Sequence, residues 1–234
     1  MKNIVIIPCR MGSKGITRKN LQKIGKDTLL SRAVKAGQIL SNEVYISSES
    51  NEIKKICIEN NWHYLKRPVE LAGDFSTDFQ YIDYHITNDF QLKAHDCITL
   101  MRPTSPLRTI TALLRLKKII HDESQIFSSI RSVIEAPITP YKMWYEHKGF
   151  LKKLALKNPD SLDEPFNSPR QKLPKIYWQT GTYDVYRREN ILDGKLSGEN
   201  ILSFKALHPE IDVDTIDDLE NIRNIIQKTE YNWL

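Results

Sequence analysis

The chain has 234 residues, of which 40% are hydrophobic and 27% are charged, the composition of an ordinary globular protein. This length is enough for one well-buried domain. The 34 lysines and arginines exceed the 29 aspartates and glutamates by only five, so the charge suits an anionic small molecule as well as a nucleic acid. Because no basic stretch is interleaved with aromatic residues, we expect no nucleic acid partner.

Cysteine content and hydropathy indicate the compartment. Cys9, Cys57 and Cys97 lack the spacing of a metal site and cannot all pair, so we expect reduced thiols. No apolar run is long enough to cross a membrane, and the first residues lead directly into a predicted strand rather than a signal peptide. We therefore expect a cytoplasmic protein without a membrane partner.

The predicted elements begin with a buried strand over residues 4–7, an apolar run that ends at Pro8. A helical pattern runs from Thr28 to Ile39. Further strands are predicted at 44–48, 63–65, 97–101 and 126–133, and further helices from 49–52 onward, over 76–90 and over 110–120. This alternation predicts an α/β fold, with a doubly wound, mostly parallel sheet.

The loop after the first strand has the chemistry of a polyphosphate site. Gly12 and Gly15 allow the backbone to approach an anion closely. Positive charges surround them: Arg10, Lys14, Arg18 and Lys19. The spacings of the Walker ATP-binding loop and of the dinucleotide fingerprint are both absent. A solvated basic surface is the alternative interpretation.

The alternation of strands and helices stops near Pro137. Residues 139–171 contain several prolines and no helical period, so they form either a long irregular loop or a separate strand-rich excursion. A strand is expected again over 176–186, an extended segment over 211–215 and a closing helix over 216–227. We predict a single domain over residues 1–234 with residues 139–171 inserted in it.

Asp212 and Asp214 form a candidate metal site. In an extended segment residues i and i+2 point to the same face, so both carboxylates can reach one cation. Mg²⁺ commonly binds one or two carboxylates together with substrate phosphates. The alternative is that Thr215 begins a helix and that Asp214 helps to cap it.

Five motifs, in order, resemble those of the acylneuraminate cytidylyltransferases, which activate sialic acids and related nonulosonic acids. The first is Arg-x-Gly-Ser-Lys-Gly-x-x-x-Lys-Asn over residues 10–20, with Cys9 where the family usually has alanine. The others are Arg-Pro-x-Glu-Leu-Ala-x-Asp over 67–74, Pro-Thr-Ser-Pro-Leu-Arg over 103–108, Pro-Arg-Gln-x-Leu-Pro over 169–174 and Ile-Asp-Val-Asp-Thr-x-x-Asp-Leu over 211–219.

The resemblance implies a CTP-dependent nucleotidyltransferase with a nucleotide-diphospho-sugar transferase-like fold. It would transfer CMP from CTP to a hydroxyl of an acidic sugar, release pyrophosphate, use Mg²⁺ and form a homodimer through an arm over 139–171. The implied catalytic residues are Arg10, Lys19 and Asp212, and the implied metal ligands are Asp212 and Asp214. The implied nucleotide-binding residues are Arg10, Gly12, Ser13, Lys14, Asn20, Arg67 and Thr77. The implied acceptor-binding residues are Arg102, Thr104, Ser105, Arg170, Gln179 and Asp184.

The acceptor side departs from the sialic acid enzymes. Arg102 replaces a glutamine, and residues 178–184 replace a segment that faces the sugar in the family. We therefore expect an acidic sugar other than N-acetylneuraminate, with an extra or displaced anionic group near Arg102 and a hydroxyl or amine near Asp184. Alternatively, Arg102 and Asp184 pair with each other. Two other functions stay open: another nucleotide or a sugar phosphate as substrate, and a non-catalytic nucleotide-binding protein.

Overall fold

The computed structural model describes residues 1–122, 124, 126–154, 156, 162–228 and 231–234. The chain divides into two compact units. The core unit consists of residues 1–132 and 180–234, and the inserted unit consists of residues 133–179. The inserted unit extends beyond the predicted range of 139–171 on both sides. It includes the last residues of strand β7 (Ser129–Glu135) and the first residues of strand β10 (Tyr177–Arg187).

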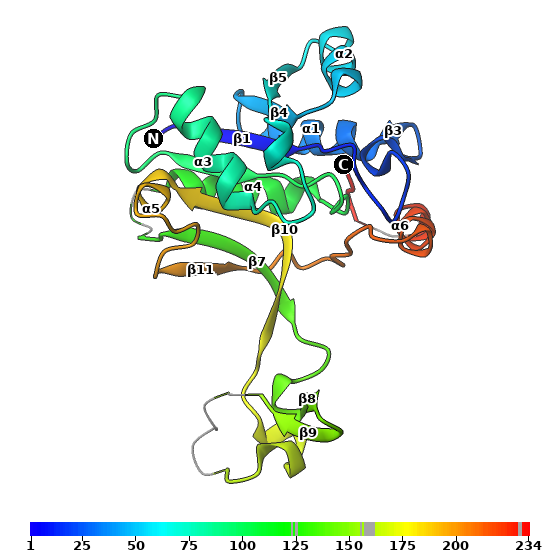
Figure 1. Ribbon diagram of the computed structural model, residues 1–234, viewed down its shortest axis with the longest axis vertical. Coiled ribbons are helices and arrows are strands. Elements are labelled where there is room, and N and C mark those ends of the chain that lie inside the picture. Colours follow the sequence, from blue (N-terminus) through cyan, green and yellow to red (C-terminus); the bar gives the residue numbers. More distant parts are fainter. Residues whose placement is uncertain (123, 125, 155, 157–161, 229–230) are drawn as a thin grey trace. The chain divides into compact units, whose positions relative to one another are not determined.

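The central element is a seven-stranded sheet in the order β11-β7-β10-β6-β1-β4-β5 (Figure 1). Its remaining strands are β1 (Asn3–Pro8), β4 (Val44–Ser48), β5 (His63–Lys66), β6 (Cys97–Leu100) and β11 (Ile201–Phe204). Parallel pairing joins β5 to β4, β4 to β1, β1 to β6 and β11 to β7. Strand β10 runs antiparallel to β6. The predicted mostly parallel α/β sheet is confirmed.

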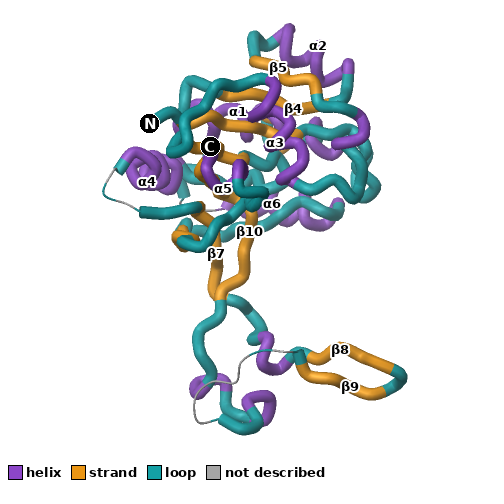
Figure 2. Tube along the Cα trace, turned by 60° about the vertical axis from the view of Figure 1, so that its left-hand side comes forward, coloured by secondary structure: helices purple, strands orange, loops and turns teal. Residues whose placement is uncertain are grey.

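Helices pack against both faces of this sheet (Figure 2). They are α1 (Leu29–Leu40), α2 (Asn51–Glu59), α3 (Asp78–Asn88), α4 (Ile110–His121) and α5 (Arg188–Leu192). Helix α6 (Ile216–Lys228) belongs to a third apolar cluster, with Ile24 and Leu29. Val5 and Ile7 of β1 belong to an apolar cluster with residues of α1 and α4, whereas Ile4 and Ile6 belong to another cluster with residues of α3. Since successive strand residues point to opposite faces, this division accounts for the continuous apolar run in β1.

Short polar side chains set the helix starts. Thr28, Ser50, Thr77 and Thr109 each accept a hydrogen bond from a backbone N–H in the first turn of the helix that follows. Helix α3 begins at Asp78 rather than at residue 76, because Thr77 and Gln80 form a capping box. Among the described helices, none combines the length and apolar character that crossing a bilayer requires.

The predicted extended segment over 211–215 is not a strand of the sheet. It is a loop whose backbone is attached to another loop, since the Val213 N–H donates to the Thr104 carbonyl at 2.7 Å. The edge strand β11 was not predicted, because it is only four residues long and mostly exposed. A small antiparallel hairpin of β2 (Lys23–Ile24) and β3 (Asp27–Thr28) was also missed.

The inserted unit contains an antiparallel hairpin of β8 (Trp144–His147) and β9 (Phe150–Lys153), which lie side by side in Figure 2. Its two-residue turn has positive φ at both Lys148 and Gly149, as a type I′ turn requires. Short 3₁₀ turns begin at Pro140 and Pro165, where proline is tolerated because no N–H is needed. Residues 133–179 form a compact unit of their own, and residues 155 and 157–161 lie outside the described part.

Candidate active site

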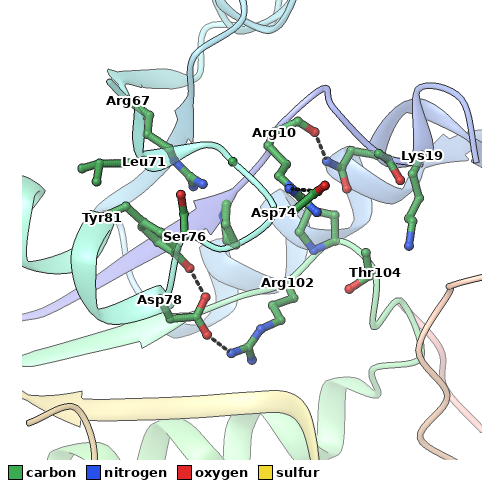
Figure 3. A pocket seen from close by; sticks show the side chains of 15 residues that line it. Arg10, Lys19, Arg67, Leu71, Asp74, Ser76, Asp78, Tyr81, Arg102 and Thr104 are labelled. Atoms are coloured by element: carbon green, nitrogen blue, oxygen red, sulfur yellow. Dashed lines mark hydrogen bonds and ion pairs between the residues drawn. The ribbon is translucent and has the colours of Figure 1, made fainter. Parts of the chain in front are cut away.

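A cavity of about 240 Å³ lies in the core unit, beyond the carboxyl ends of its parallel strands (Figure 3). Its lining comes from the loops that follow β1, β5 and β6 and from the first turn of α3. The lining residues are Pro8, Arg10, Ser13, Lys19, Asn20, Arg67, Leu71, Gly73, Asp74, Ser76, Asp78, Tyr81, Arg102, Pro103 and Thr104. This edge of a parallel sheet is where ligands bind in open α/β folds.

The loop after β1 and the segment around Asp214 meet beside this cavity. A Cβ atom on Gly15 would lie 2.5 Å from the Asp214 carbonyl oxygen, so a side chain at position 15 would clash with backbone. Lys19 Nζ donates to the Val213 carbonyl at 2.7 Å and contacts an Asp214 carboxylate oxygen at 3.0 Å. The first and the last predicted motifs are thus adjacent, although nearly 200 residues separate them.

Asp74 joins two of the predicted phosphate-binding cations. Its carboxylate contacts Arg10 Nη1 at 2.9 Å and Lys14 Nζ at 2.5 Å. The hydrogen bonds from Lys14 and Arg10 hold the pKa of Asp74 below its usual value. Asn20 donates to the Arg10 carbonyl at 3.0 Å and so fixes the loop backbone. Gly12 and Lys14 do not line the cavity, and Lys14 is 85% exposed.

Asp212 and Asp214 are both exposed, whereas Val213 between them is buried. Asp212 accepts a hydrogen bond from Ser105 Oγ at 2.9 Å. The side chain that caps α6 is Thr215, whose hydroxyl accepts from the Asp218 N–H at 3.2 Å, so the Asp214 carboxylate is not the cap. Among the described residues no cluster of three or more metal-ligating side chains exists. A pair of exposed carboxylates fits Mg²⁺ if phosphates complete its coordination.

Arg102 pairs with Asp184, as the alternative interpretation held, and also with Asp78, whose side chain is 34% exposed. Its guanidinium contacts Asp184 at 2.6 Å and Asp78 at 2.5 Å, and Asp184 also contacts Arg131 at 3.0 Å. Asp184 is fully buried and does not line the cavity. Burial alone would lower the pKa of Arg102, but Asp78 and Asp184 raise it well above its usual value. Two carboxylates therefore balance this guanidinium, and its presence does not require an extra anionic group on a ligand.

The other predicted residues have varied surroundings. Arg67 lines the cavity and lies over the Tyr81 ring at 4.0 Å. Thr104 also lines it, whereas Thr77 caps α3 instead. The remaining two predicted residues, Arg170 and Gln179, belong to the inserted unit, where Arg170 lines a separate cavity of about 370 Å³.

Three titratable lining residues were not predicted as site residues: Asp74, Asp78 and Tyr81. Asp74 belongs to a recognised motif, so its charge beside a basic loop was a usable signal. Asp78 and Tyr81 follow the helix cap at Thr77, and residues three apart on a helix share one face. The capping pattern therefore placed both on one face, but nothing in the sequence showed that this face borders a cavity.

In a comparison with known proteins, residues 4–118 match the cytidylyltransferase family model. Two N-acylneuraminate cytidylyltransferases from Streptococcus agalactiae, serotypes III and Ia, are each 26% identical over 237 residues, covering 95% of this chain and 52% of the relative. One from Escherichia coli O18:K1:H7 is 29% identical over 120 residues, covering 50% of this chain and 28% of the relative. The chain spans about half the length of the first two curated relatives.

Solved structures show the same fold at low sequence identity. A CMP:2-keto-3-deoxy-manno-octonic acid synthetase complexed with CTP superposes with a TM-score of 0.69 at 13% identity, covering 97% of this chain and 99% of the other. A 4-diphosphocytidyl-2C-methyl-D-erythritol synthase superposes with a TM-score of 0.64 at 12% identity, covering 96% and 98%. The family match over residues 4–118, the ordered motifs and the curated relatives together support the cytidylyltransferase family for this chain.

Proposed function

We propose that the chain is a CTP-dependent cytidylyltransferase that transfers CMP to a hydroxyl of an acidic sugar of the nonulosonic type. The observation that carries this proposal is the cavity wall formed by Arg10, Ser13 and Lys19, because Lys19 also contacts the exposed Asp214 carboxylate at 3.0 Å. Cations, a hydroxyl and a carboxylate pair are the groups that a metal-bound triphosphate needs. The curated relatives, named N-acylneuraminate cytidylyltransferases, support this choice of nucleotide and acceptor.

In the proposed reaction the sugar hydroxyl oxygen attacks the α-phosphorus of CTP. A new oxygen–phosphorus bond forms as the bond to the bridging oxygen of the β-phosphate breaks, and pyrophosphate leaves. Catalysis of such a step depends on positioning and on neutralising charge more than on covalent chemistry. Lys19, whose side chain is only 12% exposed, and Arg10 would stabilise the negative charge that develops on the leaving group.

Asp212 and Asp214 would hold Mg²⁺, with Ser105 keeping the Asp212 carboxylate in place. When bound, the ion would polarise the α-phosphate and lower the pKa of the attacking hydroxyl. Lys19 would keep the Asp214 segment beside the loop through its bond to the Val213 carbonyl.

For the acceptor we retain Thr104 and Arg102 on the cavity wall and Arg170 and Gln179 as proposed contacts. Asp184 does not line the cavity, so it would act on the acceptor only by holding Arg102, which it contacts at 2.6 Å. A pocket built for one set of polar groups rejects analogues that lack them. We therefore propose low activity with N-acetylneuraminate and higher activity with another nonulosonate.

A pyrophosphate-release assay tests this proposal. CTP, ATP, GTP and UTP would each be combined with N-acetylneuraminate, with modified nonulosonates and with sugar phosphates, in the presence and absence of Mg²⁺. We expect release only with CTP, Mg²⁺ and an acidic sugar. Release with a sugar phosphate instead would contradict the acceptor class, and no release with any combination would contradict the enzyme assignment. If N-acetylneuraminate is the best acceptor, the interpretation of residues 178–184 is wrong.

We also propose that the inserted unit mediates a homodimer. It exposes many large hydrophobic side chains, and such surfaces in soluble proteins commonly mark interaction sites. They are Ile138, Met143, Trp144, Tyr145, Phe150, Leu151, Leu156, Tyr177 and Trp178. Light scattering should give the mass of two chains for the wild type and of one chain for Phe150→Glu. Lys152→Gln, on the same strand and with the same charge change, is the control that should stay dimeric. A monomeric wild type would refute the proposal.

A further inference from the structure

A buried chain of hydrogen bonds lies behind Arg67 in the core unit. Arg67 Nε donates to Ser47 Oγ at 2.9 Å, Ser47 Oγ lies 2.7 Å from His85 Nε2, and His85 Nδ1 lies 2.6 Å from an Asp89 carboxylate oxygen. Ser47 and His85 are fully buried and Arg67 is 3% exposed, whereas the Asp89 side chain is 35% exposed. The chain thus connects the cavity wall to the protein surface.

The chemistry of the four groups gives these hydrogen bonds one direction. An ionised carboxylate only accepts, so His85 Nδ1 carries the proton that it donates to Asp89. Because burial lowers the pKa of His85, its ring is neutral near pH 7, so Nε2 is an acceptor and accepts from the Ser47 hydroxyl. The Ser47 oxygen in turn accepts from Arg67 Nε. Ser47 and His85 therefore each donate one hydrogen bond and accept one, Arg67 only donates, Asp89 only accepts, and the tautomer of His85 follows from Asp89.

Two further contacts fix the Arg67 side chain. Its Nη2 donates to the Ser47 carbonyl at 3.2 Å, and its guanidinium lies over the Tyr81 ring at 4.0 Å. Within the described residues Nη1 has no hydrogen-bond partner, and Arg67 lines the cavity, into which Figure 3 shows its guanidinium pointing. The side chain is held in place with one nitrogen left to donate to a ligand.

We propose that Asp89 and His85 are positioning residues, which act through Ser47 to hold Arg67 ready to donate to an acceptor atom of the bound nucleotide. This inference rests on the proposed function. Arginine has many rotamers, and ordering it only when the nucleotide binds would weaken affinity. If His85 is a positioning residue, its effect on nucleotide binding depends on Arg67. A buried histidine with only a structural role would affect binding whether or not Arg67 is present.

Asp89→Asn is the informative variant because Asp89 lies at the surface end of the chain. An asparagine amide can donate to His85 Nδ1, which reverses the tautomer and sets Nε2–H against the Ser47 hydroxyl. We expect the dissociation constant for CTP with Mg²⁺, measured by calorimetry, to rise about threefold to tenfold. KM for CTP should rise in parallel while kcat is little changed. Asp83→Asn, on the same helix and without a partner among the described residues, is the control that should not change affinity.

A double-mutant cycle decides between positioning and general structure. Asp89→Asn should have no further effect in an Arg67→Ala background, because its action passes through Arg67. An equal effect in both backgrounds, or unchanged affinity in Asp89→Asn alone, overturns the inference. So does an Arg67→Ala variant that binds CTP as tightly as the wild type. If the wild type itself does not bind CTP, the proposed function fails and the inference fails with it. Ser47→Ala, which removes only the hydroxyl, should reproduce the loss seen with Asp89→Asn.

Discussion

The two ends of the cavity both contain paired charges, but the pairs differ in their access to solvent. At the end formed by the loop after β1, Arg10 and Lys14 pair with Asp74, which is 35% exposed, and Lys19 pairs with Asp214, which is 75% exposed. At the other end Arg102 pairs with Asp78, which is 34% exposed, and with the fully buried Asp184, and the two ends differ through Asp184.

This difference indicates which charges a ligand can recruit. Exposed ion pairs contribute little to stability, so an incoming anion can replace the carboxylate at small cost. A buried pair has already lost its solvation, and removing one partner leaves a charge uncompensated. The loop end is therefore suited to exchange a carboxylate for a phosphate, whereas the Arg102 end holds its shape whether or not a ligand is bound.

The largest expected effect is at the exposed carboxylates, where function and stability should separate completely. Asp212→Asn and Asp214→Asn should each lower kcat by about 10³-fold, because each removes a proposed metal ligand from the charge-stabilising machinery. Their thermal midpoints should stay close to that of the wild type, since Thr215 caps α6. Asp217→Asn, in the first turn of α6, is the control for charge. A variant that melts far earlier, with activity proportional to the folded fraction, would indicate a structural role instead.

The buried end should show the opposite behaviour. Asp184→Asn leaves the guanidiniums of Arg102 and Arg131 without their shared carboxylate and should lower the free energy of unfolding by about 3 kcal/mol. Asp74→Asn at the exposed end should leave it nearly unchanged. Urea denaturation followed by circular dichroism measures both. Similar values for the two variants would show that burial does not distinguish the two ends.

The loop end could be predicted from the sequence because its signals are local. The apolar run of β1, the glycines and the cations between residues 10 and 20 are contiguous, and capping residues mark the helix starts. The sequence did not show that Gly15 lies against the Asp214 carbonyl, which leaves no room for a side chain at position 15.

The buried end and the edge of the sheet depended on contacts between distant residues. Arg102 and Asp184 meet because β6 and β10 pair antiparallel, a register that no local pattern specifies. Pairing between them was an open alternative, but the contributions of Asp78 and Arg131 were not predicted. Strand β11 is too short and too exposed to give an apolar signal. The sequence predicted an extended segment over residues 211–215. These residues form a loop instead, whose Val213 N–H donates to the Thr104 carbonyl of another loop.

Acid should lower the stability of the core unit by protonating two buried histidines. Burial lowers the pKa of both His85 and His208 below the usual 6.5. Below about pH 6.5 these histidines are therefore protonated in the unfolded chain but still neutral in the folded chain. The free energy of unfolding is highest above about pH 6.5 and falls as the pH drops from there toward the folded-state pKa values. The thermal midpoint should be flat from pH 8 to 7 and decline below 6.5. A variant with His85→Gln and His208→Gln should show a shallower decline than the wild type. An unchanged slope would assign the acid sensitivity to carboxylates, which titrate at lower pH.

The smallest expected effect is at Asp74, the carboxylate that a triphosphate would have to displace. Asp74→Asn removes the charge that competes with CTP for Arg10 and Lys14, so CTP should bind a few-fold more tightly, and no more, because exposed pairs are weak. The gain should shrink as salt rises from 50 to 500 mM, since salt screens an exposed carboxylate even without the substitution. Calorimetric titration of CTP with Mg²⁺ at both salt concentrations measures the change, and Asp83→Asn controls for net charge. Weaker binding in Asp74→Asn would mean that Asp74 orients Arg10 for the nucleotide rather than competing with it, and the loop end would then be as preorganised as the buried end.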